Sequence, residues 1–104
     1  MNQLDHLLQL FDETMDDCRA IIAAKNHDYT SGSDDTLANF RASEVLGVDP
    51  GIGILIRCMD KFKRIQTFIE QGKLEVKGEA VDDAIKDVIN YLVLLKLYTE
   101  ESSY

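Results

Sequence analysis

The sequence predicts an all-α protein: a small bundle of three long helices and one short helix, in a single domain over residues 1–104. Apolar residues recur at intervals of three and four residues over three long stretches, as on a helix with one apolar face. Breaker residues separate these stretches, and no region is rich in strand patterns. A chain of 104 residues, 45% hydrophobic and 29% charged, suits one globular domain.

The first long helix is expected over residues 3–26. Its apolar stripe consists of Leu4, Leu8, Phe11, Met15 and Ile22, with Leu7 and Cys18 alongside. A polar loop rich in breaker residues follows over residues 28–35. A short helix that stops near Gly47 is then indicated by three apolar residues, Leu37, Phe40 and Val45.

The second long helix has clear signals at both ends. Asp49 is a good cap for the free amide hydrogens of a helix start, and Pro50 tolerates the first helical position. Gly72 suits the C-terminal end. The apolar pattern between these ends consists of Ile52, Leu55, Ile56, Met59, Phe62, Ile65 and Ile69.

The last helix is expected to begin near Glu79 and to fade around Thr99, after a charged connector over residues 73–78. It is apolar nearly all round from Ala84 to Tyr98. A chain of this size leaves much apolar surface uncovered. Completion of the bundle by a homodimer or a larger homo-oligomer is therefore expected.

Bulk properties restrict the other partners. Nineteen acidic against eleven basic residues give a net charge of -8, which opposes binding to nucleic acid polymers. The apolar runs fall short of the roughly 18 residues that cross a bilayer, so no membrane partner is expected. Cys18 and Cys58 do not make a disulfide framework, and both are expected to be buried core residues in a cytoplasmic protein.

The strongest functional signal is a polar stripe on the last helix. Its members follow one another at steps of four, four and three residues: Glu79, Asp83, Asp87 and Asn90. The same spacing continues to Leu94 and Leu97, so the stripe is expected to point inward. Buried acids need a positive neighbour, and oxygen ligands suit Mg²⁺ or Mn²⁺. The alternative is a solvated acidic face favoured by the helix dipole, which does not account for Asp87 and Asn90.

A second polar group lies on the helix that begins at Pro50. It comprises Arg57, Asp60, Lys61 and Arg64, at steps of three, one and three residues. In the functional interpretation, Asp60 joins the metal ligands and the three cations bind phosphate oxygens. An ordinary solvated face with ion pairs is an equally good interpretation of the same pattern.

Further candidates surround the polar loop. Lys25 and Tyr29 would hold a phosphate and stack on a base, whereas His27 lacks a second ligand for zinc. Asn39 offers an amide that would read a base edge. Phe40 offers an aromatic ring that would pack on the base, although a Phe is more often a core residue.

Four blocks of sequence, in order, resemble a known family. The blocks are KNHDY at 25–29, NF at 39–40, RCMDKFKR at 57–64 and EAVDDAIKDVINY at 79–91. Over residues 15–97 the chain resembles the nucleotide modification associated domain, a phage and bacterial family of small all-helical proteins. That family looks related to the MazG-like all-alpha nucleoside triphosphate pyrophosphohydrolases, so the resemblance implies a MazG-like bundle.

The resemblance also implies chemistry. The wider superfamily binds Mg²⁺ through acids on two adjacent helices and cleaves nucleotides between the α and β phosphates. Its usual motifs are EExxE and ExxD. The second motif has a match at Glu79 and Asp82, or offset at Glu79, Asp83 and Asp87, whereas the first is missing from the middle helix, where Asp60 stands alone.

Two hypotheses of function follow. In the first, the protein is a Mg²⁺-dependent pyrophosphohydrolase that converts (deoxy)nucleoside triphosphates to monophosphate and pyrophosphate. The metal ligands are Asp60, Glu79, Asp83 and Asp87. Asp83 also acts as the base, and Lys61 offsets the charge that develops on the phosphates.

In the second hypothesis, the same pocket captures a nucleotide or a nucleotide-derived signal without cleaving it, as a phage sponge or an accessory of nucleotide metabolism. A nucleotide is the small-molecule partner in both cases. Its binding residues are Lys25, His27, Tyr29, Asn39, Phe40, Arg57, Lys61, Arg64 and Asn90. A helical interaction protein whose acids only keep it in solution is a third possibility.

Overall fold

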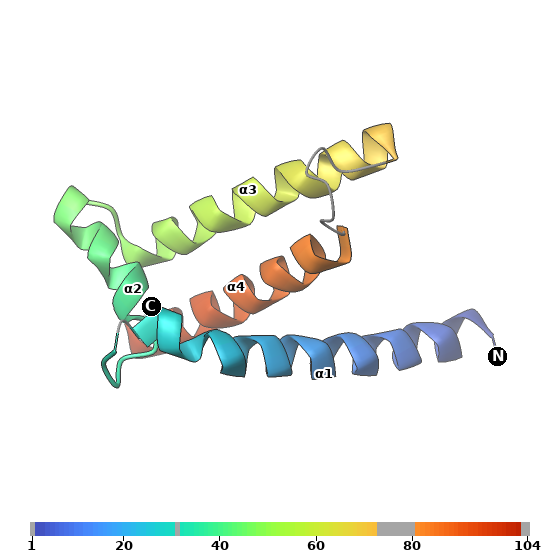
Figure 1. Ribbon diagram of the computed structural model, residues 1–104, viewed down its shortest axis with the longest axis horizontal. Coiled ribbons are helices and arrows are strands. Elements are labelled where there is room, and N and C mark those ends of the chain that lie inside the picture. Colours follow the sequence, from blue (N-terminus) through green and yellow to red (C-terminus); the bar gives the residue numbers. More distant parts are fainter. Residues whose placement is uncertain (1, 31, 73–80, 103–104) are drawn as a thin grey trace.

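The computed structural model describes residues 2–30, 32–72 and 81–102 (Figure 1). Its elements are helices: α1 (Gln3–Thr30), α2 (Ala38–Arg41), the 3₁₀ helix η1 (Ala42–Leu46), α3 (Pro50–Gln71) and α4 (Val81–Glu101). Helix α4 lies between α1 and α3 and packs against both, while α2 closes one end of the bundle. The prediction of a small all-α bundle with three long helices is confirmed.

Helix α1 is longer than the sequence indicated. It was expected to end near residue 26 and to give way to a loop at residue 28, but it continues to Thr30. Tyr29 and Thr30 are buried, and the Thr30 hydroxyl donates a hydrogen bond to the carbonyl of His27 at 2.9 Å. Packing of the last turn against the rest of the molecule therefore outweighs the polar character of its sequence.

The short helix lies where it was expected but has two parts. Residues of α2 form one α-helical turn, and η1 continues it as a 3₁₀ helix. Gly47 ends the segment with a φ of 74°, a left-handed conformation that favours glycine. The predicted end near Gly47 is therefore confirmed, whereas Val45, one of the residues that indicated this helix, is 88% exposed.

The predicted ends of α3 are confirmed in detail. An oxygen of the Asp49 carboxylate accepts a hydrogen bond from the Gly51 amide at 2.7 Å, and Pro50 occupies the first turn. Gly72 has a φ of 74° and its amide donates to the carbonyl of Phe68. The Tyr98 hydroxyl donates to the other Asp49 oxygen at 3.0 Å, which ties the start of α3 to the end of α4.

Helix α4 ends at Glu101, two residues beyond the predicted end at Thr99. The predicted start at Glu79 and the connector over residues 73–78 lie outside the part of the chain that the structure describes.

The buried core lies at the α2 end of the bundle. Its main cluster contains Tyr29, Leu37, Phe40, Ile54, Leu94 and Tyr98. Cys18 and Cys58 are buried at 3% and 1% exposure, as expected, and burial raises the pKa of both thiols. No helix in the described ranges is both long enough and apolar enough to cross a membrane.

Candidate functional site

Three charged side chains meet where α4 is flanked by α1 and α3. The Nζ of Lys61 lies 3.0 Å from one Asp87 oxygen, and the Nζ of Lys25 lies 3.5 Å from the other. The side chains of Asp87 and Lys61 are only 18% exposed, whereas that of Lys25 is 45% exposed. We call these three residues the charged layer. Two cations share one anion there, so the layer has a net positive charge.

An aromatic cluster lies one helical turn closer to α2. The ring centroids of Tyr29 and Phe40 are 5.3 Å apart, and Tyr91 meets Phe40 edge to face at 6.5 Å. The guanidinium carbon of Arg57 lies 4.6 Å from the Phe40 ring centroid, within the range of a cation–π interaction. We call these four residues the aromatic layer.

The two layers are stacked because each long helix contributes a pair of residues four apart. Lys25 and Tyr29 form this pair on α1, and Asp87 and Tyr91 form it on α4. Helix α3 runs away from α2, whereas α1 and α4 run toward it, so the order along the chain is reversed. Arg57 of α3 therefore belongs to the aromatic layer, and Lys61 belongs to the charged layer. Residues four apart lie on the same face of a helix, so both layers lie on one face of each helix, where the helices meet.

The Tyr29 phenol remains neutral over the physiological range. Burial, with Tyr91 and the Asp87 carboxylate as neighbours, raises its pKa to about 12, although the nearby Arg57 cation opposes this shift. The aromatic layer therefore has one positive charge, from Arg57, and no ionised phenol at Tyr29.

The polar stripe of α4 points inward only in part. Asn90 is buried and its amide donates to the carbonyl of Cys18 at 3.1 Å, which ties α4 to α1. Asp87 is half-buried, but Asp83 is exposed, so the prediction that this residue points inward is wrong. Helices α3 and α4 stay side by side along their length, whereas α1 diverges from α4 with distance from α2 (Figure 1). Asp83 precedes Asp87 by one helical turn and so lies farther from α2.

The counter-charge of Asp87 comes from protein cations. The sequence predicted a metal ion for this purpose, but two lysines provide positive charge beside the half-buried Asp87. Asp60 is 62% exposed and contacts Arg64 at 3.4 Å. No group of three or more His, Cys, Asp or Glu side chains in the described ranges could hold a metal ion. Glu79 lies outside those ranges, so Mg²⁺ or Mn²⁺ at this stripe stays a prediction.

The remaining candidates from the sequence lie outside the two layers. His27 is exposed near the end of α1, and Asn39 is half-buried on α2. Arg64 is 38% exposed beside Asp60.

Tyr91 and Lys86 are the residues that the sequence analysis missed. Tyr91 follows Asp87 by four residues, the same spacing that links Lys25 to Tyr29, and this repetition was the available signal. Lys86 contacts Asp82 at 2.7 Å and Asp17 at 3.0 Å, which raises its pKa and gives both acids a positive neighbour. The spacing of four residues between Asp82 and Lys86 was an available signal for the first pair, whereas nothing in the sequence linked Asp17 to Lys86.

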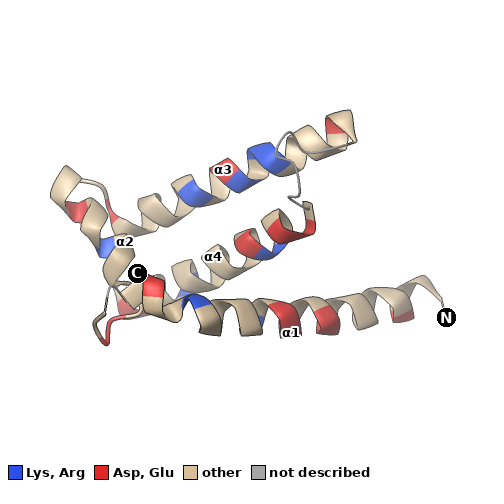
Figure 2. Ribbon diagram, viewed as in Figure 1, with Lys and Arg blue, Asp and Glu red and all other residues tan. Residues whose placement is uncertain are grey.

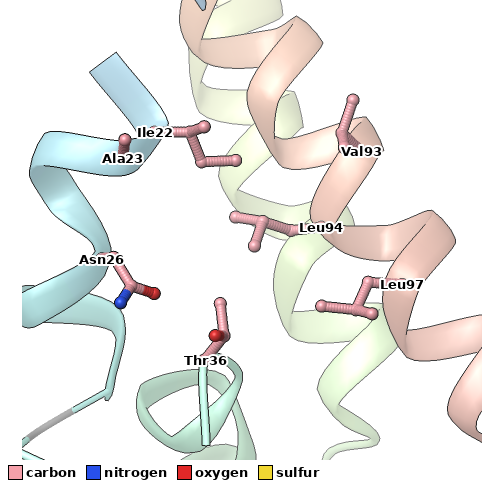
Figure 3. A pocket seen from close by; sticks show the side chains of 7 residues that line it. All are labelled: Ile22, Ala23, Asn26, Thr36, Val93, Leu94 and Leu97. Carbon is pink, nitrogen blue, oxygen red and sulfur yellow. The ribbon is translucent and has the colours of Figure 1, made fainter. Parts of the chain in front are cut away.

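A separate cavity of about 250 Å³ lies between α1 and α4 (Figure 3). Its lining residues are Ile22, Ala23, Asn26, Thr36, Val93, Leu94 and Leu97. Asn26 and Thr36 are its polar members, and they face Leu94 and Leu97 across the opening (Figure 3). Since the lining residues in the described ranges include no charged side chain, this cavity suits an apolar group better than a phosphate.

Comparisons with known proteins assign no family. A scan against protein-family models, a search of curated proteins and a search of solved structures each found no match to this chain. The resemblance carried by the four sequence blocks therefore stays a prediction, and a function can be inferred only from the geometry of the site.

Proposed function

We propose that the charged and aromatic layers form a binding site for a nucleotide, which the protein holds without cleaving it. The observation that carries this proposal is the excess of cations over acids within the two layers. Lys25 and Lys61 come from different helices and share the single carboxylate of Asp87. Together with Arg57, the two layers as defined contain three cations and one carboxylate in a protein whose net charge is -8.

The lysines suit the phosphates. Each ammonium group has three hydrogen-bond donors, and Asp87 uses only some of them. The Lys25 side chain is 45% exposed, so its remaining donors can reach a ligand. Charge-assisted hydrogen bonds to phosphate are roughly twice as strong as neutral ones, and partial burial of Lys61 strengthens the attraction further.

The aromatic layer suits the base. Arg57 and Tyr91 are half-buried, so each retains exposed surface, whereas Phe40 supports Arg57 from the buried side. A base that stacks on such groups gains about 1–3 kcal/mol. Because the layers lie one helical turn apart, about 5.4 Å, a nucleotide can reach both at once.

Binding without cleavage is the function that the described side chains support best. Hydrolysis between phosphates needs a group that activates water. In the superfamily that the sequence resembles, this group is a metal ion held by several acids. Asp87 is neutralised by lysines, and Asp60 and Asp83 are exposed. These carboxylates therefore do not assemble into a ligand set.

A Mg²⁺-dependent pyrophosphohydrolase is the second candidate. One observation favours it: Asp83 precedes Asp87 by one turn on the same side of α4, and Glu79 precedes Asp83 by the same spacing in the sequence. If Glu79 supplies further oxygen ligands, these acids and Mg²⁺ would make the chemistry of the first hypothesis available.

Calorimetric titration of the full chain with ATP, ADP, adenosine and pyrophosphate, in the presence of EDTA, tests the first proposal. The nucleotides are expected to bind more tightly than adenosine. Replacement of Lys61 by Gln should weaken nucleotide binding about tenfold or more, because a charge-assisted contact contributes about 1.5–3 kcal/mol. Lys63→Gln is the matched control: it removes the same charge from an exposed position of α3, and binding should change less than about twofold.

Two results would contradict the binding proposal: no nucleotide binds, or the Lys61 and Lys63 variants weaken binding equally. The second candidate is tested in the same samples by adding Mg²⁺ and measuring nucleoside monophosphate. Release of monophosphate that disappears in a Glu79→Gln variant would establish the pyrophosphohydrolase instead.

A further inference from the structure

The N-terminal part of α1 has an apolar stripe that nothing in the described chain covers. Residues 3–13 are all exposed, and this segment extends past the ends of α3 and α4 (Figure 1). We call it the α1 arm. Its large apolar side chains are 50–60% exposed: Leu4, Leu7, Leu8, Leu10 and Phe11. The same stripe continues to Cys18 and Ile22, which pack toward α4. The arm therefore extends the apolar face with which α1 packs on α4, but no described residue covers that face along the arm.

Helix α3 has a second uncovered stripe. Ile52, Leu55, Met59 and Phe62 follow one another at steps of three, four and three residues and are 40–64% exposed. We call these four residues the α3 stripe. This spacing is the heptad pattern of helices that pack side by side. A cavity of about 220 Å³ lies beside the stripe, between Ile52 and Leu55 of α3 and Leu95 and Tyr98 of α4, and can receive an inserted side chain.

The accessible surface area is larger than that of a typical compact monomer of this mass. The accessible surface is 7403 Å², whereas a compact monomer of 11.8 kDa has about 5,900 Å². The excess exceeds the roughly 800 Å² that each partner contributes to a standard interface. The radius of gyration, 15.6 Å, is also above the value of about 13 Å for a compact chain of this length.

Charge identifies which surfaces fit together. Residues 3–13 of the arm contain three acids and no Lys or Arg: Asp5, Asp12 and Glu13. Helix α3 contains four Lys or Arg against two acids, and Figure 2 shows its basic segments. Lys63 follows Met59 of the stripe by four residues, which is about one turn. Contact between two arms would oppose acids to acids, and contact between two α3 helices would oppose bases to bases. An arm against α3 is the combination with attractive charges.

We propose that a second copy of this chain covers the α3 stripe with its α1 arm. Two-fold symmetry then produces the same contact twice, because the arm of each copy lies on α3 of the other. Both apolar stripes are buried in one step, and the acids of each arm approach Lys63 of the other copy. This dimer depends on no ligand, so it is independent of the nucleotide-binding proposal.

Sedimentation equilibrium of the full chain tests the dimer. The unmodified protein is expected to be dimeric, and Leu8→Glu and Phe62→Glu should each weaken the dimer about 30-fold or more, as for a central interface residue. Both side chains are more than half exposed in one copy, so the helical circular dichroism should not change. Val45→Glu is the matched control, since Val45 is 88% exposed on η1 and belongs to neither stripe.

Cross-linking identifies the surfaces. A mixture of ¹⁴N- and ¹⁵N-labelled protein is treated with a carbodiimide, which joins a lysine to a neighbouring carboxylate. Links between copies are expected from Lys63 to Asp5 or Asp12. A monomer at every concentration, a dimer unaffected by Leu8→Glu, or links between copies that join α3 only to α3 would overturn the proposal.

Discussion

At the scale of single residues, Asp87 has a different role from the one that its neighbours in the sequence indicated. In the sequence it belongs to a row of acids, and repulsion within that row favours a metal ion. In the structure it is shared by two lysines from two other helices. The acid therefore acts as a positioning residue, because it holds Lys25 and Lys61 where we propose that phosphates bind.

Replacement of Asp87 by Asn is expected to lower the free energy of unfolding by about 1–3 kcal/mol. The half-buried Lys61 would lose its counter-ion and remain close to Lys25. Urea denaturation measures the change. Asp83→Asn is the control, because Asp83 is exposed, and its effect should stay within about 0.5 kcal/mol. A gain of stability in the Asp87 variant would instead support relief of repulsion among neighbouring acids.

Tyr29 should make the fold sensitive to alkaline pH. Its pKa is raised from 10.0 to about 12 in the folded protein. The folded state therefore keeps this proton more tightly than the unfolded state. The resulting stability is fully present below pH 10 and is lost as the pH rises from 10 to 12.

Phenolate absorbance and urea denaturation across this pH range, in the unmodified protein and in Tyr29→Phe, measure the effect. The Tyr29→Phe variant should have one fewer phenol that ionises near pH 12, and its stability should fall less as the pH rises. A phenol at Tyr29 that ionises near pH 10 in the folded state would show that its environment is more solvated than this structure indicates.

At the scale of the helices, the ends of α3 were the most predictable feature. Asp49, Pro50 and Gly72 act through their own backbone and near neighbours, so their sequence is enough to locate both ends. The end of α1 was less predictable, because its last turn is stabilised by burial of Tyr29 and Thr30. That burial depends on residues distant in the sequence.

Asp49→Ala is expected to lower the free energy of unfolding by about 1–3 kcal/mol. It removes the cap on the Gly51 amide, which contributes about 0.5–2 kcal/mol, and the bond from the Tyr98 hydroxyl. Thermal or urea denaturation measures the loss. Tyr98→Phe removes the hydroxyl alone and should cost about 0.5–1.5 kcal/mol, which separates the two contributions. Equal losses in the two variants would mean that the cap itself adds no stability.

At the scale of the whole molecule, α3 and α4 stay side by side, whereas α1 diverges from α4 with distance from α2 (Figure 1). Tyr29 and Phe40 of the aromatic layer are buried, Asp87 and Lys61 of the charged layer are half-buried, and Asp83 is exposed. This arrangement also leaves the α1 arm and the α3 stripe uncovered. Both proposals, the nucleotide site and the dimer, therefore depend on the same packing of α1, α3 and α4.

The sequence by itself determined the helical class, the positions of most helices, the caps of α3 and the burial of both cysteines. These features follow from spacing and from interactions between residues close in the chain. Within a helix, the same spacing correctly placed Asp87 and Asn90 on one side of α4. It could not tell which side chains from other helices would lie opposite them.

Only the tertiary structure decided that Lys25 and Lys61 neutralise Asp87, that Asn90 bonds to the backbone of α1, and that Arg57 packs on Phe40. Each of these contacts joins residues from two different elements. The physical reason is that the free energy of a charged or amide group depends on the atoms that surround it after packing. Periodicity along one helix specifies a direction, but it contains no information about the neighbour that fills the space in that direction.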